Sequence, residues 1–152
     1  MFSKEEAKAV REEFWTTFKR RSARIRRKQG LPAAWVLTNT GINALNLRFH
    51  VDREVAQVGI DLETRNMDKR LELYEKLESL KKLMEEAMGG PMIWELEYIR
   101  ENGKSVSRIY VQTDGVDIYR NETWDRAHGF MVEQMLRLEA FFLEYKDYLR
   151  YN

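Results

Sequence analysis

The sequence predicts an α+β fold, with an antiparallel sheet of about five strands and long helices packed on one face of it. Residues 45–62 and 94–111 alternate apolar and polar side chains with the two-residue period of strands. Three other segments carry apolar residues at helical spacing. The strands are adjacent in sequence and joined by short turns, so the predicted order α-β-β-β-α-β-β-α excludes a doubly wound parallel sheet.

The first predicted helix begins at a capping box, in which the Ser3 hydroxyl accepts a hydrogen bond from the Glu6 amide and the Glu6 side chain reaches back. Its apolar stripe is Ala7, Val10, Phe14 and Phe18. We expect this helix to run into a basic segment and to stop before Gly30-Leu-Pro32. Trp35-Val-Leu37 is then predicted as a short strand.

Two hairpins follow from the alternating segments. In the first, a two-residue turn at Asp52-Arg53 would place Leu47 opposite Val58, so that the apolar sets of the two strands meet. In the second, Asn102-Gly103 is the preferred sequence for a type I′ turn. That turn would place Trp94 opposite Val111, with the pairs Leu96–Ile109, Glu97–Arg108 and Glu101–Lys104 beside it.

Two long helices complete the predicted fold. One runs from about Asp68 to Met88 and ends at Gly89-Gly-Pro91. The other runs from about Glu122, with Asn121 as its cap, almost to the end of the chain. A helix of about 28 residues would extend about 42 Å, which is longer than a domain of this size is wide. Because one sheet cannot cover its last turns, we expect a homodimer formed through this helix, near Phe141, Tyr148 and Tyr151.

Composition limits the possible classes of protein. At 152 residues, with 43% hydrophobic and 34% charged residues, the chain fits one globular domain spanning residues 1–152. It has no cysteine, which excludes disulfides and thiolate chemistry and suits a reducing compartment. The polar N-terminus does not read as a signal peptide, and no apolar run approaches the length of a membrane span. We therefore expect a cytoplasmic protein with no membrane contact.

One basic segment points to a partner. Seven of the ten residues from Lys19 to Lys28 are cationic, and the other 142 residues carry 19 cations against 25 anions. Such a local field attracts phosphate or an anionic protein surface. No aromatic residue interleaves the cations, so base stacking has no support. The alternative is a solvated helix end whose cations complement the helix dipole. The candidate contact residues are Lys19, Arg20, Arg21, Arg24, Arg26, Arg27 and Lys28.

A second candidate site is the polar face of the sheet, predicted to project away from the core. Its residues are Arg48, His50, Asp61, Glu63, Glu95, Glu97 and Arg108. Paired carboxylates on such a face could hold Mg²⁺ or act as acid and base. However, the Glu-x-Lys pattern of restriction-type nucleases is missing, and charged residues are ordinary on the water-facing side of an antiparallel strand. We therefore expect no metal site and no cofactor.

The two histidines, His50 and His128, show no spacing typical of transition-metal ligands. His128 lies on the apolar stripe of the last helix, so a buried, hydrogen-bonded imidazole is expected there. His50 next to Asp52 has no serine or cysteine positioned to complete a catalytic triad.

Several short motifs resemble one family along nearly the whole chain: Ser3-Lys-Glu-Glu-Ala7, Glu13-Phe-Trp-Thr16, Trp35 with Asn39-Thr40, Ile60-Asp-Leu-Glu63, Arg108-Ile-Tyr110, Trp124, and Phe141-Phe142 with Tyr145. They are similar to the small stand-alone bacterial members of the domain of unknown function 4268 family. The resemblance implies no catalytic residues. Relatives also occur behind a restriction-endonuclease-like domain, which implies nucleic-acid or defence contexts. The stretch of about 19–33, a basic helix extension and loop, departs from many small relatives in length and charge.

The sequence therefore favours a non-catalytic binding or accessory module over an enzyme, contacting nucleic acid or another anionic partner through residues 19–28. One alternative is a divalent-metal-dependent hydrolase or nuclease that uses Asp61, Glu63, Glu95 and Glu97. Another is a structural protein–protein interaction domain in which the cations promote solubility.

Overall fold

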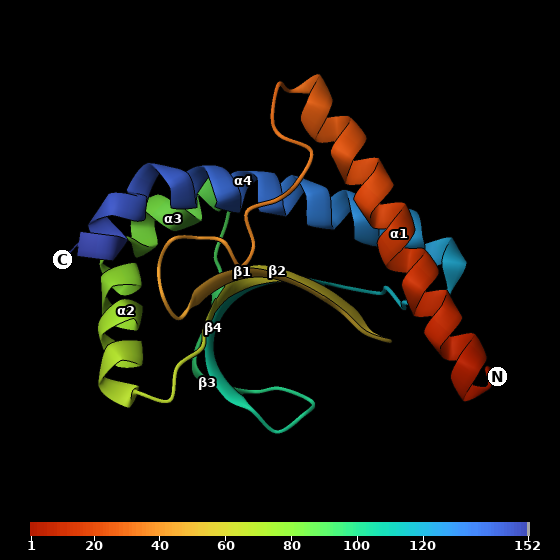
Figure 1. The fold of residues 1–152 in the computed structure, drawn as a ribbon, viewed down its shortest axis with the longest axis horizontal. Coiled ribbons are helices and arrows are strands. Elements are labelled where there is room, and N and C mark those ends of the chain that lie inside the picture. Colours follow the sequence, from red (N-terminus) through yellow and green to blue (C-terminus); the bar gives the residue numbers. More distant parts are fainter. Residues whose placement is uncertain (152) are drawn as a thin grey trace. The chain divides into compact units, whose positions relative to one another are not determined.

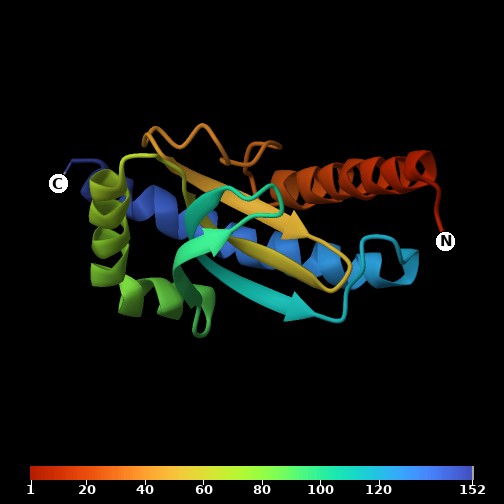
Figure 2. The same ribbon diagram turned by 90° about the horizontal axis from the view of Figure 1, so that it is seen from below.

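The computed structural model describes residues 1–151, with four α-helices and one four-stranded antiparallel sheet in that part of the chain. Its strand order is β1-β2-β4-β3 (Figures 1 and 2). The α+β class is confirmed, whereas the expected fifth strand is not formed. The elements in chain order are α1 (Lys4–Lys28), β1 (Leu45–Val51), β2 (Val55–Leu62), α2 (Met67–Ser79), α3 (Lys81–Met88), β3 (Ile93–Ile99), β4 (Ser105–Asp114), a 3₁₀ turn (Asn121–Thr123) and α4 (Trp124–Tyr151).

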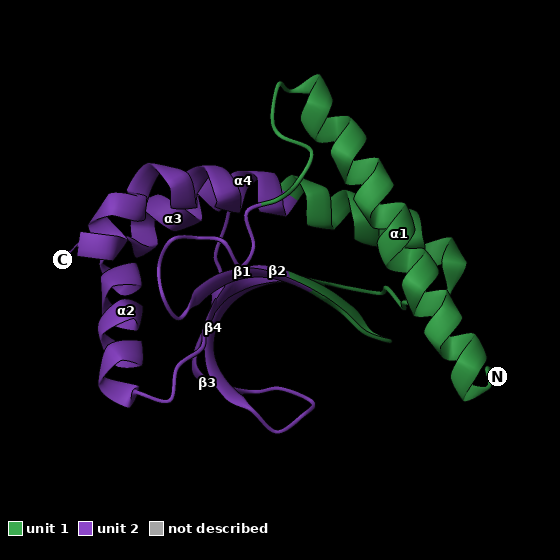
Figure 3. Cartoon of the chain, viewed as in Figure 1, with its two compact units in different colours: residues 1–35, 50–57, 112–133 green, residues 36–49, 58–111, 134–152 purple. Residues whose placement is uncertain are grey.

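The chain divides into two compact units (Figure 3). The first unit comprises residues 1–35, 50–57 and 112–133, and the second comprises residues 36–49, 58–111 and 134–152. The single domain expected over residues 1–152 stays a prediction. No helix among residues 1–151 combines the length and apolarity needed to cross a membrane.

The predicted strand at Trp35–Leu37 is absent because side chains take the hydrogen bonds that a neighbouring strand would need. The Val36 amide donates to the Glu139 carboxylate at 2.9 Å, and the Leu37 amide donates to the Asn39 side chain at 3.3 Å. Only the Leu37 carbonyl reaches the sheet, where it accepts a hydrogen bond from the Leu47 amide at 2.9 Å. One such bond does not make a strand.

The first hairpin forms with its turn one residue later than predicted. The Asp52 amide donates to the Val55 carbonyl, so the two turn residues are Arg53 and Glu54. Asp52 suits the first position of such a turn because its carboxylate accepts the amides of Glu54 and Val55 at 2.8 and 2.9 Å. The predicted register is wrong by two residues. A shift of two keeps every side chain on its predicted face.

The second hairpin also forms, but its turn and register differ from the prediction. Arg100 and Lys104 close a three-residue loop, in which only Gly103 has positive φ. The turn is therefore a type I turn followed by a glycine bulge, and the predicted type I′ turn is wrong. Trp94 pairs with Ile109, and the register shifts between Glu95 and Tyr98. The longer loop and the bulge each shift the register by one residue, so that Glu95, and not Glu97, faces Arg108.

The first unit is built around an aromatic cluster between α1 and the start of α4. The predicted capping box is confirmed, with Ser3 and Glu6 bonded in both directions. The Phe14 ring packs edge-on against Trp124, with ring centroids 5.4 Å apart, and lies 4.5 Å from the His128 ring. This cluster fixes the crossing of the two helices.

In the second unit, the helix predicted over 68–88 is two helices that meet at Leu80. The Leu80 amide donates to the Leu77 carbonyl, and α2 ends at Ser79. Side chains then join both helices to α4: Ser79 bonds Tyr148 at 2.7 Å, and Arg137 donates to the Met88 carbonyl at 3.0 Å. The apolar residues that these helices bury include Leu73, Leu77, Met84, Met88, Met135 and Leu138. Phe141 is also buried, so its expected exposure is wrong.

Candidate functional site

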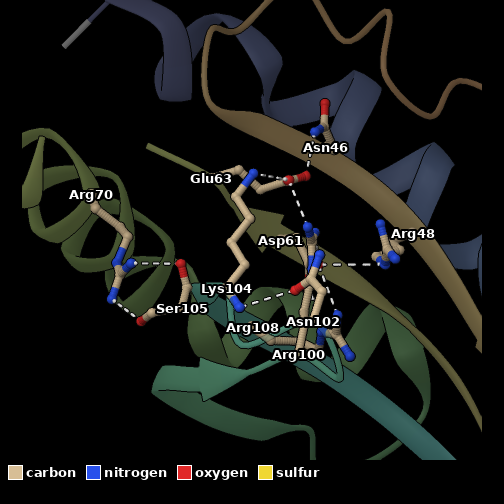
Figure 4. Close-up of polar contacts among 10 residues, drawn as sticks. All are labelled: Asn46, Arg48, Asp61, Glu63, Arg70, Arg100, Asn102, Lys104, Ser105 and Arg108. Carbon is tan, nitrogen blue, oxygen red and sulfur yellow. Dashed lines mark hydrogen bonds and ion pairs between the residues drawn. The ribbon is translucent and has the colours of Figure 1, made fainter. Parts of the chain in front are cut away.

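A buried carboxylate, Asp61 of β2, organises the polar face of the sheet in the second unit (Figure 4). Arg108 of β4 approaches it with two nitrogens, at 2.7 Å and 2.9 Å. Arg100 donates to the same carboxylate at 2.6 Å, and Arg48 lies 3.6 Å away. The predicted water-facing position of Asp61 and Arg108 is wrong, because both side chains are at most 3% exposed.

The neighbouring carboxylate, Glu63, is neutralised in a similar way at the end of β2. Arg100 donates to one of its oxygens at 2.9 Å, Lys104 lies 3.4 Å from the same oxygen, and Asn46 donates to the other at 2.6 Å. Burial by itself would raise the pKa of Glu63, but the hydrogen bonds from Arg100 and Asn46 lower that pKa to about 2. Glu63 therefore carries its charge at any ordinary pH.

Aromatic side chains close the cluster on the β3 side. The guanidinium of Arg108 lies over the Tyr98 ring at 3.9 Å, which shields its ion pair from water. Tyr110 donates its hydroxyl to Glu95 at 2.7 Å. Burial, followed by this bond to Glu95, raises the pKa of Tyr110 above its usual value. Glu95 is thus a hydrogen-bond acceptor in the sheet and is not grouped with Asp61.

Cations outnumber anions in this cluster. Four basic side chains surround the two carboxylates of Asp61 and Glu63. They belong to Arg48, Arg100, Lys104 and Arg108. Burial, followed by repulsion from Arg100, lowers the pKa of Arg48. These six side chains therefore carry a net positive charge. Among residues 1–151 no three histidine or acidic side chains converge as metal ligands. Of the four carboxylates that the metal-dependent hydrolase would use, Asp61 and Glu63 are bound by arginines, and Glu95 accepts the Tyr110 hydroxyl.

A surface pocket of about 740 Å³ adjoins the cluster at the start of α2. Thr64, Arg65 and Met67 line it from the segment that leads into the helix. The other walls consist of Glu63, Arg70, Glu97, Lys104 and Ser105. Of the predicted polar-face residues, the pocket contains only Glu63 and Glu97.

The structure divides the basic segment of α1 into two classes of cation. Arg26 is 2% exposed; it donates to the carbonyls of Pro32 and Ala34 at 2.7 and 3.1 Å and stacks on Trp35. Arg21 is half-buried and bonds Asp125 at 2.6 Å. These two cations hold the end of α1. The other five, which are exposed and form no ion pair among the described residues, are Lys19, Arg20, Arg24, Arg27 and Lys28.

Both histidines lie in the first unit and take part in local contacts. His128 is 2% exposed, as predicted, and its Nδ1 accepts a hydrogen bond from Arg21 at 3.1 Å. Burial and then the charge of Arg21 lower the pKa of His128 to about 4, so this imidazole is neutral. His50 bonds Asp52 at 3.0 Å beside the hairpin turn and belongs to no larger site.

The sequence analysis did not single out Arg70, Arg100 or Lys104 as residues of a site. Arg100 and Lys104 flank the second turn, where the predicted register left no partner on β2 for them. Arg70 carried a usable signal, because it falls one turn before Leu73 and Tyr74 on the apolar stripe of α2. A charged residue on a buried stripe indicates a specific partner or a binding role.

The fold and the site together define a small α+β protein with an arginine-rich sheet face and a basic helix end, in which the charged side chains mostly bind one another. The chain belongs to the family described as Domain of unknown function (DUF4268), whose model matches residues 10–146. No curated protein and no solved structure matches this chain significantly.

Proposed function

We propose that the protein is a non-catalytic module that binds the phosphate backbone of nucleic acid through the basic end of α1. The observation that carries the proposal is the division of the seven cations. Two of them hold the helix end in place, and five project from it with no acidic partner among the described residues.

The exposed cations form a definite surface on α1. Arg20, Arg24 and Arg27 follow one another at spacings of four and three residues, which places them on one helix face. The buried stripe, Phe14, Phe18, Ser22 and Arg26, lies on the opposite side. Because the loop carbonyls of Pro32 and Ala34 anchor Arg26, the basic face is presented on an ordered helix, and little conformational entropy is lost when an anion binds.

The composition of this face favours backbone contact over base recognition. No aromatic residue lies between Lys19 and Lys28, so bases have no ring on which to stack. Contacts between arginine or lysine and phosphate are independent of sequence and release counterions. With three to five such contacts, the logarithm of the binding constant should fall with the logarithm of salt concentration at a slope of about −3 to −4.5.

Binding of a labelled DNA duplex, followed by fluorescence anisotropy at several salt concentrations, tests the proposal. The triple variant Arg20→Glu/Arg24→Glu/Arg27→Glu should lose binding. The variant Lys8→Glu/Lys69→Glu/Lys82→Glu makes the same change of charge at other exposed positions and serves as the matched control. Equal losses in both variants, or no salt-dependent binding by the wild type, would rule out the α1 surface.

The homodimer expected through α4 is a separate proposal. Its support is the exposure of Leu143 and Tyr148, at 51% and 41%, and of Tyr151, at 70%, along the last turns of α4. Sedimentation of the protein at high concentration tests it, since a strict monomer would exclude this surface as a dimer contact. A dimer that fails to bind DNA would favour the protein–protein interaction domain.

A further inference from the structure

The pocket at the start of α2 contains a buried cation that lacks a negative partner. Arg70 is 2% exposed and lines this pocket. Its two terminal nitrogens donate to neutral acceptors, namely the Ser105 carbonyl at 3.2 Å, the Ser105 hydroxyl at 3.3 Å and the Leu96 carbonyl at 3.4 Å. Its Nε has no hydrogen-bond partner, and no carboxylate among residues 1–151 forms an ion pair with it.

A buried guanidinium without a counter-charge is costly, and native proteins normally place a carboxylate or a bound anion beside it. The nearby carboxylate of Glu63 does not perform this role, because Arg100, Asn46 and Lys104 occupy its oxygens. The charge of Arg70 is thus left for a group that enters the pocket.

The pocket also contains the N-terminus of a helix. Asn66 caps α2 by accepting the Lys69 amide at 3.1 Å, and its carbonyl accepts the Arg70 amide. The amides of Met67 and Asp68, the first two residues of α2, have no acceptor among the described residues. Such free amides, together with the positive end of the helix dipole, favour an anion at this position.

Two further cations stand at the rim. Arg65 is exposed beside the cap, and Lys104 reaches across from the start of β4 (Figure 4). The acidic residue of the first turn, Asp68, lines a different depression of the surface and not this pocket. The three cations of the pocket outnumber its two carboxylates, Glu63 and Glu97, so the charges favour an anion over a neutral ligand.

We propose that this pocket binds the phosphate group of a small phosphorylated molecule. The phosphate would lie between Arg65, Arg70 and Lys104, with the Met67 amide as a further donor. The volume of about 740 Å³ falls in the range of small-molecule sites and exceeds what a phosphate alone requires. Glu97, which is exposed at the edge, would accept hydrogen bonds from hydroxyl groups on the rest of the ligand. This proposal is independent of the α1 surface.

Amide NMR spectra of the whole chain, recorded during titration, test the site. The probes are inorganic phosphate, adenosine 5′-monophosphate and adenosine. Both phosphate probes should shift the Met67 and Asp68 amide resonances, and adenosine should not. Tighter binding of the nucleotide would identify a phosphorylated small molecule as the ligand, whereas equal binding would identify the free ion. Either result supports a phosphate site.

The variant Arg65→Gln/Lys104→Gln should raise the dissociation constant about tenfold or more, as loss of charge-assisted hydrogen bonds does. Both side chains are exposed, so the fold should survive, and the unshifted remainder of the spectrum checks this. Lys69→Gln/Lys82→Gln makes the same change of charge outside the pocket and should leave the constant within about twofold. Unmoved Met67 and Asp68 resonances at about 10 mM phosphate, or equal weakening in both variants, would overturn the proposal.

Discussion

Replacing Asp61 by asparagine tests whether the buried carboxylate holds the sheet face together. The substitution keeps the shape of the side chain and removes its charge. Arg108, at 3% exposure, then loses its ion pair with Asp61, and Arg100 keeps its ion pair with Glu63. Three short hydrogen bonds, of 2.6, 2.7 and 2.9 Å, lose their charged acceptor.

The expected loss follows from these contacts. A hydrogen bond to a charged group contributes about 1.5–3 kcal/mol, and removing one partner of a buried ion pair costs about 3–5 kcal/mol. Because the three bonds share one carboxylate, their contributions do not add, and we expect Asp61→Asn to lower the free energy of unfolding by about 4 kcal/mol. For a chain of this length, that loss corresponds to a fall in melting temperature of roughly 8–16 °C.

Urea unfolding at pH 7 measures the loss, and Asp125→Asn is the matched control. Asp125 forms an equally short bond with Arg21, 2.6 Å, but its side chain is 88% exposed. Exposed ion pairs contribute about 0–1 kcal/mol, so the control should unfold almost as the wild type does. If Asp61→Asn also lowered the free energy of unfolding by less than about 1 kcal/mol, the argument that burial strengthens the Asp61 ion pairs would be refuted.

Three further predictions follow from single contacts. Arg26→Ala should lower the free energy of unfolding, measured in urea, by about 2–4 kcal/mol, because it removes a buried side chain and leaves the Pro32 and Ala34 carbonyls without their donor. The control Arg24→Ala should change that free energy by less than about 0.5 kcal/mol. Gly59→Ala should lower the free energy of unfolding by at least about 2 kcal/mol in the same assay, since a methyl group there would overlap the Ile109 carbonyl oxygen. An unchanged free energy of unfolding would contradict the close approach of β2 and β4. His128 has a pKa of about 4 in the fold and about 6.5 unfolded, so the unfolded chain binds the proton first. Stability should therefore fall by about 3 kcal/mol from pH 7 to pH 4, and this component should be missing in His128→Gln when unfolding curves are compared across that range.

Much of the fold was predictable because its signals are local. The capping box of α1 joins two residues three apart, and hydrophobic alternation places each strand residue on one side or the other. The predicted faces of β1 and β2 hold even though their register was wrong by two residues, since a shift of two leaves the alternation unchanged. The buried position of His128 was likewise readable from helical spacing.

The candidate site was less predictable because its partners are distant in sequence. Strand alternation predicts that Asp61 and Arg48 share a face of the sheet. The pairing of Asp61 with Arg108, however, requires that β2 lie next to β4, which the sequence does not show. The three-residue loop and the bulge between Glu95 and Tyr98 together place Glu95, and not Glu97, opposite Arg108, and Glu97 lines the pocket. No local pattern specifies a bulge at that position.

The sequence by itself determined the class of fold, the helix that starts at Ser3, the two hairpins and the concentration of cations at the end of that helix, because each depends on neighbours along the chain. The tertiary structure alone decided which cations are buried and hydrogen-bonded and which are exposed. Arg24 and Arg26 look alike in the sequence, yet one is exposed and the other is buried against the loop carbonyls of Pro32 and Ala34. Whether a charged side chain is paired or available depends on groups that only chain folding brings within a few ångströms.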